Sequence, residues 1–150
     1  MSADFVIRKL EIQDYHKKYL DLLEQLTIVN SKNIDFTSFQ NQFNKLDKSR
    51  DLIYIIYDKN NPDQIIGSGT LLLEYKFIRN LGIVGHIEDI VIDQNYRNKK
   101  LGSLIINHLM NVAIENNCYK VILDCSVDNI KFYEKCGFIM KEHQMVKYFK

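Results

Sequence analysis

A strand joined to a helix by a short basic turn is the feature that most restricts the fold of this chain. Residues 84–92 are mostly apolar, the turn 93–100 carries three cations, and apolar residues from Leu101 to Ala113 follow helical spacing. Strands that lead directly into helices are the units of sheets covered by helices. We therefore expect an α/β protein.

The other apolar patterns supply the remaining elements. Strands are expected at 5–10, 52–57, 64–75, 84–92 and 120–125, with closing strand material at 140–149, and helices are expected after Asp14, over 36–46, from Leu101 to 115, and after Asp128. The resulting order, β-α-α-β-β-β-α-β-α-β, predicts a mixed central sheet with helices on its faces. Gly137 is placed to end the last helix in a left-handed conformation. The length of 150 residues predicts one domain over 1–150.

Charge and composition exclude several classes of partner. Twenty basic and nineteen acidic residues give a formal net charge of +1, so no global field attracts nucleic acid or an anionic membrane. No apolar run approaches the roughly 18 residues of a membrane-spanning helix, and we expect a cytoplasmic protein. Cys118, Cys125 and Cys136 match no common zinc spacing. We expect reduced thiols and no metal.

The basic turn is a candidate anion site. Arg97, Lys99 and Lys100 precede the expected start of a helix, where unpaired N–H groups already carry partial positive charge. Bound phosphate or pyrophosphate would neutralise this cluster. The alternative is a solvated basic loop in a lysine-rich protein.

Two better-known phosphate motifs are absent. Leu72 stands where a third glycine should follow Gly67 and Gly69, and no Gly-Lys-Ser/Thr sequence occurs. These mismatches argue against dinucleotide-binding and P-loop folds.

Carboxylates interrupt two apolar strands. Glu88 and Asp89 lie within the strand at 84–92, and Asp124 lies near the end of the strand at 120–125. A partly desolvated carboxylate has a raised pKa and can accept a proton, although an exposed edge strand would explain Glu88 and Asp89 equally well. Tyr133 could donate a proton to a leaving group or could simply pack on the sheet.

Three segments together resemble the glucosamine-6-phosphate N-acetyltransferases of the GNAT superfamily. They are the sequence HIEDI at 86–90, the basic turn, and the stretch 118–138 with its CYKxxLDC and KFYEKCGF patterns. The resemblance implies a GNAT fold. It also implies direct transfer, in a ternary complex, of the acetyl group of acetyl-CoA to the 2-amino group of D-glucosamine 6-phosphate, a step of UDP-GlcNAc synthesis.

The resemblance also implies a cofactor site. The pantetheine arm would pair with Ile90, Val91 and Ile92 as an added strand, and Asn129 and Tyr133 would lie near the cofactor. The pyrophosphate would be held by Arg97, Asn98, Lys99, Lys100, Leu101, Gly102 and Ser103. The family's turn usually carries glycine where this chain has Lys100. We therefore expect weaker or rearranged cofactor binding.

On the acceptor side, the resemblance assigns Glu88 and Asp124 to orienting and deprotonating the amine, and Tyr133 to stabilising or protonating the departing thiolate. Its implied substrate contacts are Thr27, Lys76, Phe77, Ile78, Arg79, Glu88, Asp89, Asp124 and Lys147. Lys147 looks like a family arginine that contacts phosphate, and we expect it to act across the interface of a homodimer. The alternatives are a GNAT protein that acetylates another small amine and an inactive CoA-binding regulatory module.

Overall fold

The computed structural model describes residues 4–150, which form one five-stranded sheet in the order β1-β2-β3-β4-β5. The strands are β1 (Phe5–Lys9), β2 (Asp51–Asp58), β3 (Asn61–Tyr75), β4 (Ile83–Ile92) and β5 (Cys118–Ile122). The first four pair antiparallel with their neighbours, whereas β5 pairs parallel with β4. A parallel pair needs a crossover connection, which α4 (Leu101–Glu115) supplies.

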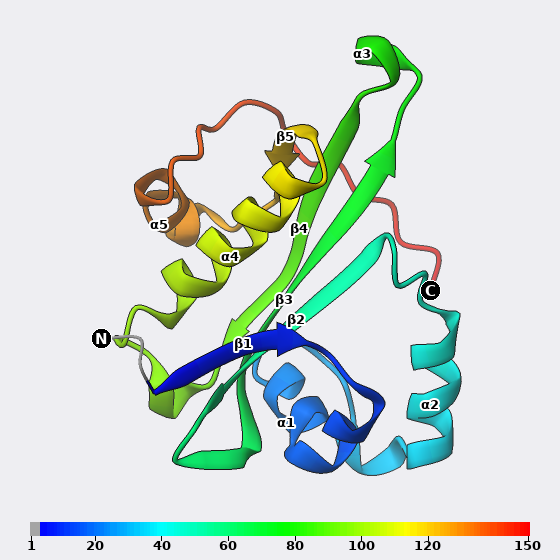
Figure 1. Cartoon of the computed structure of the whole chain (residues 1–150), viewed down its shortest axis with the longest axis vertical. Helices are drawn as coiled ribbons and strands as arrows, with labels where there is room; N and C mark the ends of the chain where they lie inside the picture. Colours follow the sequence, from blue (N-terminus) through cyan, green and yellow to red (C-terminus); the bar gives the residue numbers. More distant parts are fainter. Residues whose placement is uncertain (1–3) are drawn as a thin grey trace.

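Helices cover both faces of the sheet. Besides α4 they are α1 (Tyr19–Glu24), α2 (Phe36–Lys45), α3 (Ile78–Leu81) and α5 (Ile130–Lys135), with 3-10 turns η1 (Ile12–Lys17), η2 (Ser31–Asn33), η3 (Gln94–Tyr96) and η4 (Val127–Asn129). In Figure 1, α4 crosses the sheet diagonally, and α1 and α2 lie at its lower end. No helix within residues 4–150 is long and apolar enough to cross a membrane.

Two hydrophobic clusters hold these layers together. Ile56 and Ile66 belong to the cluster that includes α4, whereas Ile55 and Ile65 belong to the cluster that includes residues of α1 and α2. Successive strand residues face opposite sides of a sheet, so burial on both faces explains why these strands read as nearly continuous apolar runs. The expected strands of the hairpin and the helices at 36–46 and 101–115 are confirmed.

The expected helix start at Asp14 is wrong. Asp14 lies buried inside η1, where Arg8 donates from both Nη atoms to its carboxylate, each at 2.8 Å. The N–H of Glu11 also donates to Asp14 at 2.8 Å. The α-helix begins only at Tyr19, because Lys18 has a left-handed φ of 58° that separates the two helical turns.

The boundaries beyond α4 also differ from expectation. The strand β5 ends at Ile122, so Asp124 follows the strand rather than lying within it. Asp128 lies in η4, and Asn129 occupies the N-cap position of α5. Gly137 does follow the end of α5 with a φ of 94°, and this prediction is confirmed.

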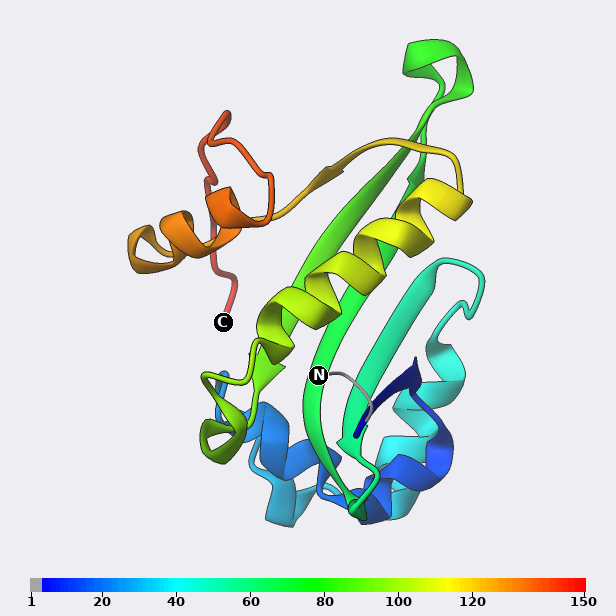
Figure 2. The same ribbon diagram turned by 60° about the vertical axis from the view of Figure 1, so that its left-hand side comes forward.

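The closing strand expected at 140–149 is also wrong, because residues 138–150 form no helix or strand. An extended segment becomes a strand only when its N–H and C=O groups pair with a sheet edge. Figure 2 shows this tail and α5 standing away from the sheet. The tail exposes a series of apolar side chains, namely Ile139, Met140, Met145, Val146, Tyr148 and Phe149.

Candidate active site

The two last strands of the sheet pair over only part of their length. The β4–β5 register runs from Ile83 opposite Cys118 to His86 opposite Ile122, whereas β4 continues to Ile92. Beyond this point the chain after β5 turns away from β4 (Figure 2). Within residues 4–150, no strand therefore pairs with residues 88–92 of β4 on that side, and an extended ligand with amide groups can add there as a strand does.

A β-bulge changes the direction of the side chains of β4 beside this open edge. Ser68 pairs with Val91 and Thr70 with Glu88, so two residues of β4 oppose Gly69 alone. One of the two, Asp89, has a φ of 53°, which is strained for a residue other than glycine. Bulges and strained residues concentrate at functional sites.

Sequence reasoning missed this bulge. A signal for it was present, because glycine inside a strand marks a bulge or a close approach. A Cβ added to Gly69 would lie 2.6 Å from Cδ1 of Ile90 and 3.1 Å from Cγ1 of Ile105, so a side chain opposite the bulge would force these neighbours to shift.

The separation of β5 from β4 beyond His86, here called the β4–β5 split, brings two of the predicted carboxylates, Glu88 and Asp124, near each other. Burial raises the pKa of Glu88, and the negative charges of Asp89 and Asp124 raise it further, while His86 acts in the opposite direction. Asp124 is exposed, and Nε2 of Gln144 donates to its Oδ2 at 3.1 Å. A partly buried carboxylate with a raised pKa can accept a proton from an ammonium group.

A polar chain extends from β4 toward the β3–β4 hairpin tip. Nε2 of His86 lies 2.6 Å from Oε2 of Glu74, and Nζ of Lys76 lies 2.7 Å from Oε1 of the same carboxylate. The hydrogen bonds from Lys76 and then His86 lower the pKa of Glu74. Sequence reasoning did not select Glu74, because its partner on β4 is 12 residues away and the link depends on strand register.

The basic turn contains two residues in the left-handed backbone conformation. Lys100 has a φ of 61° and Asn98 a φ of 64°, both left-handed. Glycine takes this conformation freely, whereas lysine does so at a cost of roughly 1–2 kcal/mol. No side chain of the described residues caps the N-terminus of α4, so its first N–H groups are available to an anion. Arg97, Lys99 and Lys100 come directly before it in the chain, and all three are exposed. Nζ of Lys99 lies 4.9 Å from the ring centre of Tyr96.

The last helix lies against the start of α4. A Cβ added to Gly102 would come within 3.1 Å of Cζ of Phe132, so the first turn of α4 packs closely on α5. The adjacent Tyr133 is half-buried, and burial raises its pKa, with smaller contributions from Cys125 and Cys136. Such a phenol stays protonated at neutral pH and can donate to a thiolate. Asn129 is exposed at the N-cap of α5.

The remaining predicted substrate contacts are dispersed in the single chain. Lys76 to Arg79 form the hairpin tip, whose backbone lies at least five residues along β4 from Glu88, or about 17 Å at strand spacing. Lys76 reaches back from it through its contact with Glu74. Thr27 lies near the opposite end of β4, two residues after Gln25, which bonds to Asp93 and Gln94. Lys147 lies in the exposed tail with Nζ 5.7 Å from the ring centre of Phe149. Glu88 and Asp124 thus lie near each other, whereas Thr27, the hairpin tip and Lys147 lie in separate parts of the single chain.

Comparison with known proteins identifies the family. The acetyltransferase (GNAT) family model matches residues 12–138. A glucosamine 6-phosphate N-acetyltransferase of Arabidopsis thaliana is 42% identical over 99% of each chain. The chain belongs to this family. Glucosamine 6-phosphate N-acetyltransferase 1 of Dictyostelium discoideum is 46% identical over 94% of this chain and 88% of its own.

Solved structures agree with this membership in the glucosamine 6-phosphate N-acetyltransferase family. The crystal structure of the Arabidopsis thaliana enzyme matches with a TM-score of 0.91, covering 97% of this chain and 99% of its own. An acetyltransferase of Trypanosoma brucei matches with a TM-score of 0.88 at 33% identity over 97% and 99% of the two chains. The split sheet described above therefore belongs to a GNAT fold.

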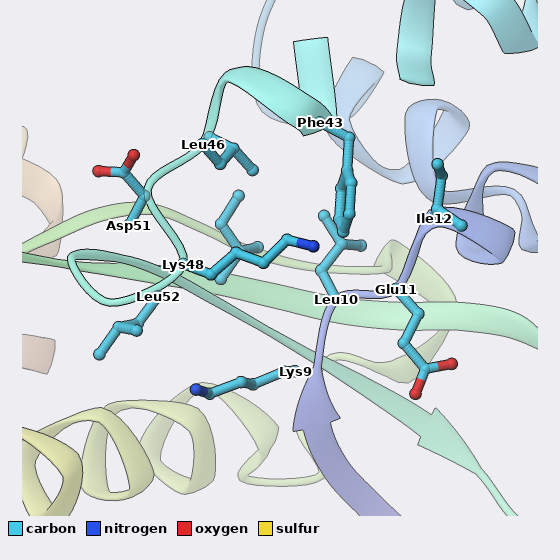
Figure 3. A pocket seen from close by; sticks show the side chains of 10 residues that line it. Lys9, Leu10, Glu11, Ile12, Phe43, Leu46, Lys48, Asp51 and Leu52 are labelled. Atoms are coloured by element: carbon cyan, nitrogen blue, oxygen red, sulfur yellow. The ribbon is translucent and has the colours of Figure 1, made fainter. Parts of the chain in front are cut away.

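A separate pocket of about 330 Å³ lies between the end of β1 and the end of α2 (Figure 3). Leu10, Phe43 and Leu46 line it together with Lys9 and Lys48, and Nζ of Lys48 lies 4.9 Å from the ring centre of Phe43. None of its lining residues is one that the family resemblance selects. The candidate active site of this GNAT acetyltransferase is therefore the β4–β5 split.

Within residues 4–150 no group of three His, Cys, Asp or Glu side chains could hold a metal ion.

Proposed function

We propose that this protein transfers the acetyl group of acetyl-CoA to the 2-amino group of D-glucosamine 6-phosphate, giving N-acetyl-D-glucosamine 6-phosphate and CoA. The observation that carries the proposal is identity over nearly the full length to enzymes that bear this substrate's name. The raised pKa of Glu88 beside an open strand edge supports the same reaction, because the acceptor ammonium must lose a proton before it can attack.

In this proposal acetyl-CoA enters along the open edge of β4. Its pantetheine amides pair with the backbone of Ile90, Val91 and Ile92, and its pyrophosphate lies at the turn from Arg97 to Ser103. The uncapped N-terminus of α4 supports this placement, since it offers N–H donors and three nearby cations to an anion. Asn129 and Tyr133 lie on the α5 side of the same cofactor site.

The chemical step needs no covalent enzyme intermediate. Glu88 and Asp124 orient the ammonium group and accept its proton, directly or through water. The neutral amine then attacks the thioester carbonyl and the new C–N bond forms. The C–S bond breaks as Tyr133 donates its proton to the CoA thiolate, and the second proton lost by the nitrogen returns to Tyr133, directly or through water. Holding the amine and thioester together supplies much of the acceleration, and proton transfer adds roughly 10²–10⁴-fold.

A homodimer completes the acceptor site in this proposal. The hairpin tip exposes Phe77, Ile78 and Leu81, and the C-terminal tail exposes Met145 and Phe149. Apolar surface of this kind commonly marks an interface. A second copy would bring its hairpin tip or its Lys147 to the substrate phosphate, because in the single chain the backbone of the tip and Lys147 lie away from Glu88. Lysine contacts phosphate as a point charge rather than as the fork of an arginine.

The proposal is tested by thiol release from acetyl-CoA with three acceptors: glucosamine 6-phosphate, glucosamine and a lysine peptide. We expect kcat/KM for glucosamine 6-phosphate to exceed that for glucosamine at least about tenfold, because the phosphate forms charge-assisted contacts. Equal turnover of glucosamine would indicate an enzyme for another small amine. Binding of CoA without turnover of any acceptor would indicate a regulatory module.

A further inference from the structure

One side chain ties the end of α1 to the start of the cofactor turn. Nε2 of Gln25 donates to Oδ2 of Asp93 at 3.1 Å, and Oε1 of Gln25 accepts from the N–H of Gln94 at 2.9 Å. The orientation of the amide is set by its partners, since a carboxylate only accepts and a backbone N–H only donates. In Figure 2 the blue α1 lies beside the yellow-green turn that comes after β4.

Asp93 connects Gln25 to the end of β4 and the start of η3. Its carboxylate is nearly fully buried, and Oδ1 accepts from the N–H of Asn95 at 2.8 Å. Its own N–H donates to the carbonyl of Ile66, and its carbonyl accepts from the N–H of Tyr96, each at 2.8 Å. A buried carboxylate needs all of its hydrogen bonds. Gln25 therefore helps to hold the residue at which β4 ends and η3 begins.

The proposed pyrophosphate site comes shortly after Asp93 in the chain. The left-handed Asn98 and Lys100 lie beyond η3 and lead into the uncapped N-terminus of α4. A shift of Asp93 would move these N–H groups relative to the open edge of β4, which fixes the other part of the cofactor. Small displacements of this kind weaken binding without removing any group that touches the ligand.

We propose that Gln25 is a positioning residue that sets the cofactor turn for CoA through Asp93 and Gln94. The inference rests on the proposed use of acetyl-CoA. Gln25 itself is exposed, so removing its amide opens the Oδ2 side of Asp93 to water, which can take over that hydrogen bond. Its loss should therefore change stability little and change the geometry of the turn more.

The test measures the Kd for CoA by calorimetry and the melting temperature for each variant. We expect Gln25→Ala to raise the Kd for CoA about fivefold, because part of the binding free energy must then be used to order the turn, with a melting temperature within a few degrees of the parent. Gln42→Ala, an exposed glutamine of α2, is the matched control and should leave the Kd unchanged.

A charge exchange separates positioning from general stability. Gln25→Glu places a carboxylate against the carboxylate of Asp93 and should raise the Kd for CoA more than about tenfold. Adding Asp93→Asn to this variant reverses donor and acceptor across the same contact, because the amide at position 93 then donates to the carboxylate at position 25. The double variant should restore the Kd for CoA to within about threefold of the parent.

Two results would overturn the role of Gln25: an unchanged Kd in both single variants at position 25, or a double variant that melts like the parent yet keeps the weak binding of Gln25→Glu. Failure of the parent protein to bind CoA would instead refute the proposed function. The two failures are therefore distinguishable, because the parent's affinity is measured first.

Discussion

Lys100 combines a strained backbone with a charge at the proposed pyrophosphate site. Because its φ of 61° suits glycine, Lys100→Gly should raise the free energy of unfolding by about 0.5–1 kcal/mol. The same change removes one cation, so the affinity for CoA should fall. Urea unfolding and calorimetry measure the two effects, and Lys100→Ala serves as the control that loses the charge but keeps the strain. A less stable glycine variant would contradict the account.

The carboxylate pair predicts a shift in the acid limb of the pH–rate profile. Glu88 must be deprotonated to accept a proton, and its raised pKa places the limb above the pH of an ordinary glutamate. Asp124→Asn removes a negative charge that raises this pKa, so the limb should move to lower pH. Maximal turnover should fall as well, because Asp124 helps to orient the amine.

The control for this profile is Asp128→Asn, which changes an exposed carboxylate in η4. Its acid limb should coincide with that of the parent. An acid limb in Asp124→Asn that stays in place or moves to higher pH would remove Glu88 as the titrating base.

At the level of elements, the end of α5 depends on one glycine. Gly137 has a φ of 94°, and its N–H donates to the carbonyl of Glu134 at 3.0 Å. Among the described residues nothing lies within 4 Å of the Cβ that an alanine would add, so Gly137→Ala meets conformational strain alone. We expect it to lower the free energy of unfolding by about 1 kcal/mol, measured by urea titration against Lys135→Ala. A neutral Gly137→Ala would show that the left-handed turn is not needed.

Elements with strong local periodicity could be predicted from sequence. The helix beginning at Leu101 and the hairpin around Pro62 are examples, because their apolar spacing and turn residues are contained in short windows. The η1 turn could not, because Arg8 fixes Asp14 through a contact that propensity does not report. The same holds for the missing closing strand, since an edge for residues 140–149 must come from elsewhere in the fold or from another chain.

The candidate site, like the fold, could be predicted only in part from the sequence. Carboxylates within apolar segments drew attention to Glu88 and Asp124, and the family resemblance gave them roles. The links that position the site join distant residues, as Gln25 joins Asp93 across 68 positions and Glu74 joins His86 across 12. Such pairs depend on strand register and helix docking, which a single sequence does not display.

For the whole molecule, the exposed tail predicts an oligomer that is required for turnover. Met145→Asp together with Phe149→Asp should weaken the proposed homodimer, because both side chains are almost fully exposed in the single chain and would be desolvated at an interface. Light scattering after gel filtration should show monomer, with turnover of glucosamine 6-phosphate reduced in parallel. Ile114→Asp, at an exposed apolar site on α4, should leave the dimer intact. A parent protein that is monomeric and fully active would contradict this prediction.

The most direct measurement traces the acetyl group itself. Acetyl-CoA labelled with ¹³C at the carbonyl is incubated with the protein and glucosamine 6-phosphate, and the label is located by NMR. The account predicts that the label appears as an amide on the 2-amino nitrogen, with one CoA thiol released for each amide formed. Label found as free acetate or as an ester of a sugar hydroxyl would contradict it.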